Sequence, residues 1–209
     1  MHYEVLDEKT KKIFEEFSFL KDTFYLAGGT ALALQLGHRI SIDLDFFSDK
    51  PIKKTLLKTI ESEVKKVDSV LVNNKKELTV YINSIKITFL HYPFIHKHNF
   101  VKNNIVPLAS INEIASMKAY ALGRRVSLKD YIDLYFILSL NITNITSIIS
   151  DAIAIYHDAF NDRLFCEQLL SPEEADEESI IWLAKAVSKK EMREFFSELI
   201  TKERKNLTK

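Results

Sequence analysis

The sequence predicts an α+β protein, in which a mixed β-sheet lobe flanked by helices is followed by an all-helical C-terminal lobe. Runs with the two-residue alternation of strands occur only in the first half, whereas helical patterns fill the chain from residue 111 onward. The 209 residues are enough for two lobes with buried cores. We therefore expect a sheet lobe over residues 1–110 and a helical lobe over residues 111–209.

The first part of the sheet lobe alternates helices and short strands. An amphipathic helix is expected from Glu8 to Leu20, followed by a strand from Phe24 to Ala27. Gly28-Gly29-Thr30 interrupts the pattern, and a short helix then stops at Gly37, a residue typical of the position just past a helix end. Alternating apolar and polar residues from Ile40 to Phe46 predict the next strand.

The remaining elements complete both lobes. Pro51 opens a lysine-rich amphipathic helix that is expected to run to about Lys66. Strands are expected over residues 69–72, 78–82 and 85–92, with the last two joined as a hairpin at Asn83-Ser84. Helices follow over residues 111–124, 128–140 and 145–160, and in two or three further segments.

Composition excludes several classes of protein. The 29 basic and 29 acidic residues balance, so no global field indicates a nucleic-acid or membrane partner. The single cysteine excludes an intramolecular disulfide and a cysteine-based zinc site. No signal-peptide pattern opens the sequence, and no apolar run is long enough to span a membrane. We therefore expect a cytoplasmic protein with no membrane partner.

Two aspartates in the sheet lobe are candidate metal ligands. Asp43 and Asp45 are two positions apart on the expected strand, so their carboxylates would project to the same face and repel each other. A divalent cation removes that repulsion. Mg²⁺ is commonly held by one or two carboxylates, together with water and the oxygens of a substrate phosphate.

The glycine pair that precedes these aspartates suits a phosphate. Gly28 and Gly29 let a ligand approach the main chain without a Cβ in the way, and the helix beginning near Thr30 would direct N–H groups at an anion. The Thr30 hydroxyl would cap that helix or donate to a phosphate oxygen. Arg39 and Ser41 add a cation and a hydroxyl where a phosphate tail would lie.

Taken singly, a Gly-Gly turn and a pair of aspartates are common structural features. In this order and spacing they resemble the nucleotidyltransferase fold of the DNA-polymerase-β superfamily, whose signature is Gly-Gly or Gly-Ser followed by Asp-x-Asp or Asp-x-Glu. The wider pattern is similar to one branch, the AbiEii/AbiGii nucleotidyltransferase toxin family, which includes the MenT-like enzymes. The residues that carry the resemblance are 28–34, 37–39, Ser41, 43–47, Lys118, Arg124 and Lys129-Asp130-Tyr131-Ile132-Asp133.

The resemblance implies a nucleotidyltransferase-type sheet lobe and a Mg²⁺-dependent transfer of a nucleoside monophosphate from an NTP to an acceptor hydroxyl. Asp43 and Asp45 would hold the metal, and Gly28, Gly29 and Thr30 would cradle the phosphates. Lys118 would neutralise the triphosphate.

Asp133 lies among apolar residues and needs a cationic partner, for which Lys118, Arg124 and Lys129 are candidates. A structural pairing and an active-site role of Asp133 are therefore both open. Asp130, three residues earlier, could share that helix face and the nucleotide site.

The resemblance also implies the toxin half of a bacterial toxin–antitoxin pair, with tRNA as a possible acceptor and a separate antitoxin protein as a possible partner. A tRNA acceptor predicts a positive track from Arg39 through Arg124 and Arg125 toward the basic C-terminal segment. A small-molecule acceptor, as in antibiotic-modifying relatives, predicts an acidic pocket instead.

One position departs from the family pattern. A third acidic residue commonly follows an apolar-basic-apolar run on a later strand, but here Ile85-Lys86-Ile87 precedes the neutral Thr88. Deprotonation of the acceptor would then fall to solvent, to a second metal or to a side chain such as His91. A catalytically weakened NTP-binding module is therefore a further alternative.

Overall fold

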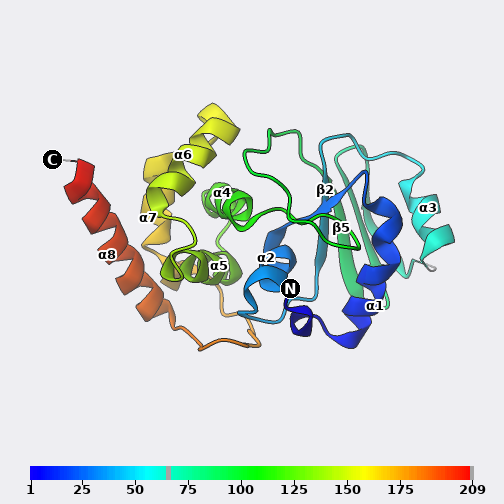
Figure 1. Ribbon diagram of the computed structural model, residues 1–209, viewed down its shortest axis with the longest axis horizontal. Helices are drawn as coiled ribbons and strands as arrows, with labels where there is room; N and C mark the ends of the chain where they lie inside the picture. The colour runs from blue at the N-terminus through cyan, green and yellow to red at the C-terminus, as the bar shows by residue number, and fades with distance from the viewer. Residues whose placement is uncertain (65–66, 208–209) are drawn as a thin grey trace. The chain divides into compact units, whose positions relative to one another are not determined.

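A computed structural model of the chain describes residues 1–64 and 67–207 (Figure 1). By its internal contacts the chain forms two compact units. The sheet unit comprises Met1–Ile95 and Asn99–Ser110, and the helical unit comprises His96–His98 and Ile111–Lys209. The expected domain boundary at residue 110 stays a prediction.

The sheet unit is built on a five-stranded mixed sheet. Its strands are β1 (Tyr25–Leu26), β2 (Leu44–Ser48), β3 (Ser69–Asn73), β4 (Glu77–Ile82) and β5 (Ile85–His91), in the spatial order β1-β2-β5-β4-β3. β2 and β5 are parallel and every other pair is antiparallel. The predicted α+β class and mixed sheet are therefore confirmed.

Helices cover both faces of this sheet. In Figure 1, α1 (Glu8–Glu16) and α3 (Leu56–Glu63) lie on one side and α2 (Gly28–Leu36) lies on the other. The rings of Phe46 on β2 and Phe89 on β5 stack with centroids 5.2 Å apart, and Phe17, in the 3₁₀ turn that follows α1, contacts both. Because side chains alternate along a strand, Asp45 and Thr88 belong to the opposite face.

Several element boundaries differ from the sequence prediction: the first helix ends at Glu16 and not at Leu20, and the helix expected over residues 145–160 ends at Tyr156. α2 begins at Gly28 and not near Thr30, and Gly28 adopts a positive φ of +69° at this first position. β2 begins at Leu44 and not at Ile40, since the backbone before it bonds outside the sheet: Ser41 donates its N–H to the Val5 carbonyl. Asp43 therefore lies one residue before the strand.

A further difference concerns α3, which begins at Leu56 and not at Pro51. The Ile52 N–H donates to the Lys75 carbonyl in the β3–β4 connection, which holds this part of the chain outside a helix. The expected end of this helix at Lys66 lies outside the described residues. The hairpin at Asn83-Ser84 is confirmed, and both residues have the positive φ of a tight two-residue turn.

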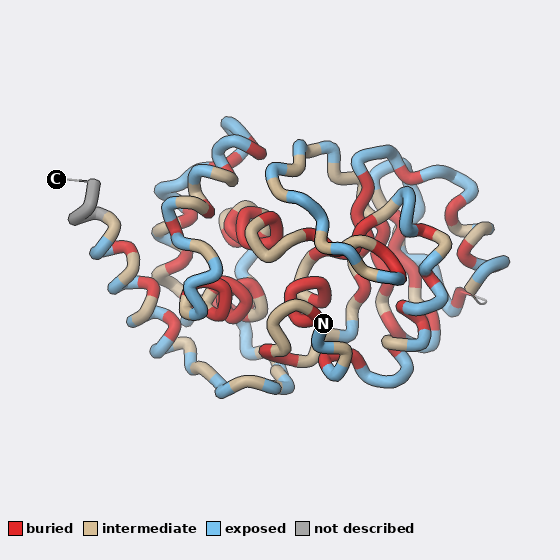
Figure 2. Tube along the Cα trace, in the orientation of Figure 1, coloured by how far each residue is buried: buried red, intermediate tan, exposed pale blue. Residues whose placement is uncertain are grey.

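The helical unit consists of α4 (Ile111–Leu122), α5 (Leu128–Ser139), α6 (Ile145–Tyr156), α7 (Asp162–Leu169) and α8 (Lys189–Leu207). Its described residues include no strand, in agreement with the sequence pattern. α4 and α5 are buried along most of their length, so polar groups inside them need partners (Figure 2). Among the described helices of the chain, none has the length and apolar character needed to cross a bilayer.

Candidate active site

The first turn of α2 lies against the Asp45 carboxylate. A Cβ placed on Gly28 would lie 3.2 Å from Asp45 Oδ2, so only a glycine leaves this carboxylate its present space. The preceding residue, Ala27, makes no side-chain cap hydrogen bond, and the first N–H groups of the helix therefore lack the usual side-chain acceptor from that position. This turn presents N–H donors beside a carboxylate.

Thr30 joins the same turn to Asp43. Its hydroxyl donates to the Asp43 carbonyl and lies 2.7 Å from Ser41 Oγ. The residue is 2% exposed and occupies the third position of α2, whose N-cap is Ala27, so the prediction that Thr30 caps the helix is wrong. Its predicted contact with a phosphate oxygen stays a prediction. The Thr30 hydroxyl fixes the segment that leads into β2.

The two aspartates suit a hard cation by the chemistry of their oxygens. Both are partly exposed, and both are held by the first turn of α2, Asp43 through its backbone and Asp45 through its contact with Gly28. The described residues contain no cluster of three or more His, Cys, Asp or Glu side chains that could hold a metal. A cation at this pair would therefore need water or substrate oxygens to complete its coordination.

Arg39, the predicted cation of this unit, is a buried residue. The residue is 2% exposed, and its Nη1 donates to the Ile40 carbonyl at 3.2 Å. Its predicted contact with a phosphate stays a prediction.

The sheet register places Thr88 beside Asp45. Asp45 on β2 pairs with Thr88 on β5, and Thr88 in turn pairs with Thr79 on β4. The position next to Asp45 is thus neutral and 94% buried, since Thr88 is 6% exposed. His91 lies three residues after Thr88 and pairs with Ser48, so it projects from the other face of β5. The suggestion that His91 replaces the missing base is therefore wrong.

The helical unit brings together the predicted residues Lys118, Asp130 and Asp133. Lys118 Nζ on α4 lies 2.6 Å from Asp130 Oδ1 and 2.6 Å from Asp133 Oδ2 on α5. Both carboxylates are fully buried and the lysine side chain is 7% exposed. The three-residue spacing puts the two aspartates on one face of α5, where both can reach the same ammonium.

Arg125 completes this charge cluster, and sequence reasoning missed its role. Its Nε and Nη2 donate to Asp130 Oδ2 and Oδ1 at 2.9 and 3.2 Å. Burial raises the pKa of Asp130, but the charges and hydrogen bonds of Lys118 and Arg125 outweigh it and hold that pKa below its ordinary value of 3.8. Arg124, the residue that matches the family pattern, instead donates to the Tyr120 and Ala159 carbonyls. The adjacent residues Arg124 and Arg125 were the available signal in the sequence. They did not show which of the two arginines pairs with Asp130.

Lys129 was a further candidate partner of Asp133, and the structure places it elsewhere. Its Nζ lies 3.0 Å from Glu178 Oε2, in a partly exposed pair. Asp133 therefore takes Lys118 as its described partner.

Three comparisons relate this chain to known proteins. The model of the family described as "Nucleotidyl transferase AbiEii toxin, Type IV TA system" matches residues 12–207. The uncharacterized protein aq_aa25 of Aquifex aeolicus (strain VF5) is 39% identical over 121 residues, which is 55% of this chain and 57% of that protein. The matched region thus spans little more than half the length of that relative.

Solved structures show the same fold. A protein from H. pylori, solved as a candidate nucleotidyltransferase, superposes with a TM-score of 0.59 at 18% identity, over 96% of this chain and 98% of its own. MenT4, the nucleotidyltransferase toxin Rv2826c from Mycobacterium tuberculosis H37Rv, superposes with a TM-score of 0.60 at 15% identity, over 93% and 86% of the two chains.

Proposed function

Because this chain belongs to the AbiEii nucleotidyltransferase toxin family, we propose that it transfers a nucleoside monophosphate from an NTP to an acceptor hydroxyl. The observation that carries the proposal is the first turn of α2, which lies against Asp45 and is bonded to Asp43. The reaction forms a bond between the acceptor oxygen and the α-phosphorus, and it breaks the bond from that phosphorus to the departing pyrophosphate.

The residues of the sheet unit bind and orient the nucleotide in this proposal. Asp43 and Asp45 hold Mg²⁺, which offsets charge on the oxygens of the triphosphate when it is bound. The N–H groups of Gly28 and Gly29 donate to phosphate oxygens, and the α2 dipole favours the anion. Thr30 keeps the segment with Ser41 and Asp43 in place through its hydroxyl.

Lys118 supplies the cation for the triphosphate. Asp130 and Asp133 hold its ammonium from two sides, so its position is fixed before the nucleotide binds. Arg125 also pairs with Asp130, so the two cations and the two carboxylates of the cluster carry no net charge. The cluster therefore repels an added anion less than two unpaired carboxylates would. Asp130 and Asp133 are positioning residues in this scheme.

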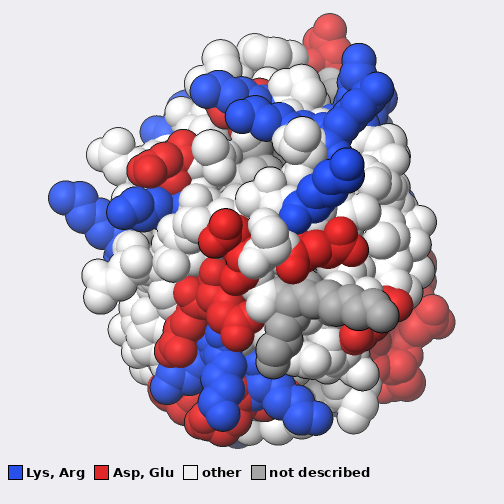
Figure 3. Space-filling view, turned by 90° about the vertical axis from the view of Figure 1, so that its right-hand side faces the viewer, with Lys and Arg blue, Asp and Glu red and all other residues white. Residues whose placement is uncertain are grey.

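The acceptor is proposed to be RNA, with tRNA as the first candidate, and a cognate antitoxin protein is proposed to counteract the activity. The family description places the activity in a toxin–antitoxin system. The face of the sheet unit that carries α3 intersperses acidic and basic side chains, so it does not resemble a phosphate-binding surface (Figure 3). RNA contacts are therefore expected elsewhere on the molecule.

The test is transfer of label from each α-³²P NTP, with Mg²⁺, into total tRNA by the full chain. We expect labelled RNA with the wild type and with Asp49→Asn, a control at an exposed aspartate just after β2. We expect loss of label with Asp43→Asn and with Asp45→Asn. Label that persists in both variants would contradict the proposed metal pair.

A second candidate function follows from Thr88, because the position beside Asp45 lacks a carboxylate. It is an NTP-binding module with little or no transfer. Mg²⁺-dependent NTP binding by calorimetry, without label on tRNA or on a hydroxylated small molecule, would favour this candidate. Label on the small molecule alone would instead favour an antibiotic-type transferase.

A further inference from the structure

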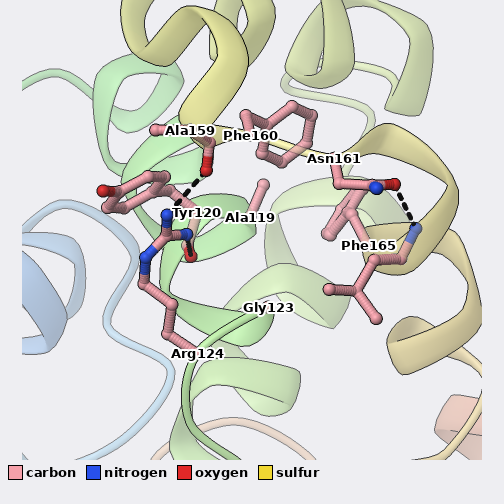
Figure 4. Close-up of a pocket in the computed structure, with 9 residues that line it drawn as sticks. Ala119, Tyr120, Gly123, Arg124, Ala159, Phe160, Asn161 and Phe165 are labelled. Carbon is pink, nitrogen blue, oxygen red and sulfur yellow. Dashed lines mark hydrogen bonds between the residues drawn. The ribbon is translucent and has the colours of Figure 1, made fainter.

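A pocket in the helical unit lies outside the groups described so far. It has a volume of about 210 Å³ and is formed by the end of α4, the segment at residues 159–161 and the start of α7. Figure 4 shows the rings of Phe160 and Phe165 on one side and the guanidinium of Arg124 on the other. All of these residues belong to one unit, so the pocket is defined without reference to the sheet unit.

The interior of the pocket suits a flat apolar ring. Ala119, Phe160, Leu164 and Phe165 line it, and Gly123 contributes no side chain. A Cβ on Gly123 would meet only Leu164 Cδ2 at 3.8 Å and the Tyr120 carbonyl at 3.9 Å, so the glycine opens space. An apolar cavity of about 150 Å³ accommodates benzene, and one of about 210 Å³ therefore has room for a somewhat larger ring system.

A fixed cation stands at one edge of this apolar space. The Arg124 guanidinium lies 3.5 Å from the centroid of the Tyr120 ring, which itself stacks on Tyr156 at 3.9 Å. Arg124 Nη1 and Nη2 donate to the Tyr120 and Ala159 carbonyls at 3.1 and 2.6 Å. These contacts hold the group in place while the residue stays exposed, and a guanidinium has five N–H donors. Further donors thus remain for an oxyanion.

The pocket rim also carries a side-chain amide. Asn161 Oδ1 accepts the Leu164 N–H at 2.9 Å, and this hydrogen bond fixes the orientation of the amide. The Nδ2 group of the same amide is a candidate donor to an acceptor atom on a ring. An apolar slot for a ring, an amide donor and a fixed guanidinium together match the base and phosphate of a nucleotide. They match an aliphatic side chain less well, because such a side chain would leave the cation and the amide without partners.

We propose that this pocket binds an unpaired base of the acceptor RNA, with Arg124 on the adjoining phosphate. The inference rests on the proposed function, since that function supplies the RNA acceptor. Stacking on aromatic side chains tolerates any base, so the pocket selects an unpaired nucleotide more than a sequence. It thereby directs a single-stranded part of the acceptor to the helical unit.

The test compares two fluorescein-labelled RNA hairpins, one with an unpaired adenosine tail and one with the same tail made abasic. Binding to the full chain is measured by anisotropy for the wild type and for Gly123→Leu, which fills the pocket. We expect the wild type to prefer the adenosine tail about tenfold, and Gly123→Leu to lose that preference while binding the abasic RNA as the wild type does. A circular-dichroism melt checks that the variant is folded.

A charge control uses the salt dependence of binding. Arg124→Ala should lower the slope of log K against log salt by about 0.7, the value for one phosphate contact on a single strand. Arg163→Ala should leave the slope unchanged, because Arg163 is an exposed arginine of the same unit that pairs with Glu167 and does not line the pocket.

Either of two results would overturn the proposal: a wild type that does not distinguish the two RNAs, or a Gly123→Leu variant that keeps the preference. Transfer of label to tRNA by the wild type together with one of these results would leave the proposed function standing. Base-dependent binding without any transfer would support the pocket and count against the proposed function.

Discussion

Asp130 shows how a single buried residue can hold two cations. It has no exposed surface, and its two oxygens accept from Lys118 and Arg125. Ionising such a carboxylate is costly unless partners compensate, and here both oxygens have a charged donor. Without the Asp130 charge, Lys118 would keep its described ion pair with Asp133. Arg125 would lose both of the hydrogen bonds to a charged oxygen that are described for it.

Asp130→Asn is therefore expected to lower the free energy of unfolding by about 3 kcal/mol at neutral pH. Because the folded-state pKa of Asp130 lies below its ordinary value of 3.8, the stability that this ionisation contributes is present above pH 3.8. It is lost as pH falls through the lowered pKa of the folded state. Urea unfolding at neutral pH and below pH 3.8 measures the difference in the free energy of unfolding between the wild type and Asp130→Asn. We expect this difference to shrink at the lower pH, and a difference that stays constant would contradict the reasoning.

Thr88 sets the chemistry available beside the metal pair, because it occupies the register position next to Asp45. If a missing base limits transfer, Thr88→Asp should raise the transfer rate by about 10²-fold, the lower end of general-base contributions. Thr79→Asp is the matched control, since Thr79 is one strand farther from Asp45 and also buried. A folded Thr88→Asp protein with an unchanged rate would show that acceptor deprotonation does not depend on this position.

At the scale of elements, α2 depends on the backbone of one glycine. Gly28 has a φ of +69°, and a Cβ added to it would lie 3.2 Å from Asp45 Oδ2. Gly28→Ala is expected to cost at least about 1 kcal/mol of stability and to weaken NTP binding, because the new Cβ is strained and contacts the carboxylate. Gly123→Ala is the stability control, since its Cβ makes only contacts of 3.8 Å and longer. Equal melting temperatures for the two variants would contradict this reasoning.

The same elements show what the sequence could and could not predict. The strand and helix types follow from periodicity, and the hairpin at Asn83-Ser84 follows from its turn residues. The start of β2 could not be predicted, because residues 40–43 alternate like a strand. In the structure their backbone groups bond outside the sheet: the Asp43 carbonyl accepts from the Thr30 hydroxyl, and the Ser41 N–H donates to the Val5 carbonyl. The choice of Arg125 over Arg124 for Asp130 is likewise decided by tertiary contacts. Local patterns carry no information about those contacts.

At the scale of the whole molecule, the chain passes between the two units more than once. It leaves the sheet unit after Ile95, returns at Asn99 and leaves again after Ser110. The short segment His96–His98 belongs to the helical unit by its contacts, and carboxylates of that unit bind it. Glu113 Oε2 accepts the N–H groups of Lys97 and His98 at 3.2 and 3.3 Å.

Side chains of this segment add to the attachment. His96 Nδ1 lies 3.2 Å from Glu113 Oε1, and His98 Nε2 lies 2.7 Å from Asp151 Oδ2. Lys97 Nζ lies 3.2 Å from Asp151 Oδ1. The two histidines thus contact different carboxylates and do not converge on one point. Glu113 is 1% exposed, and these donors contribute to the compensation that a buried carboxylate needs.

Glu113→Ala should therefore release this segment from the helical unit. Hydrogen bonds to a charged acceptor contribute about 1.5–3 kcal/mol each, so losing even one should speed amide exchange in a peptide spanning residues 93–103 by about tenfold or more. Hydrogen-exchange mass spectrometry measures this directly, with Glu167→Ala, an exposed position on α7, as the control. Peptides of α8 should exchange as in the wild type, because the change is local. If residues 93–103 exchange at the wild-type rate in folded Glu113→Ala, Glu113 does not hold the segment, and Asp151 must carry the attachment through His98 and Lys97.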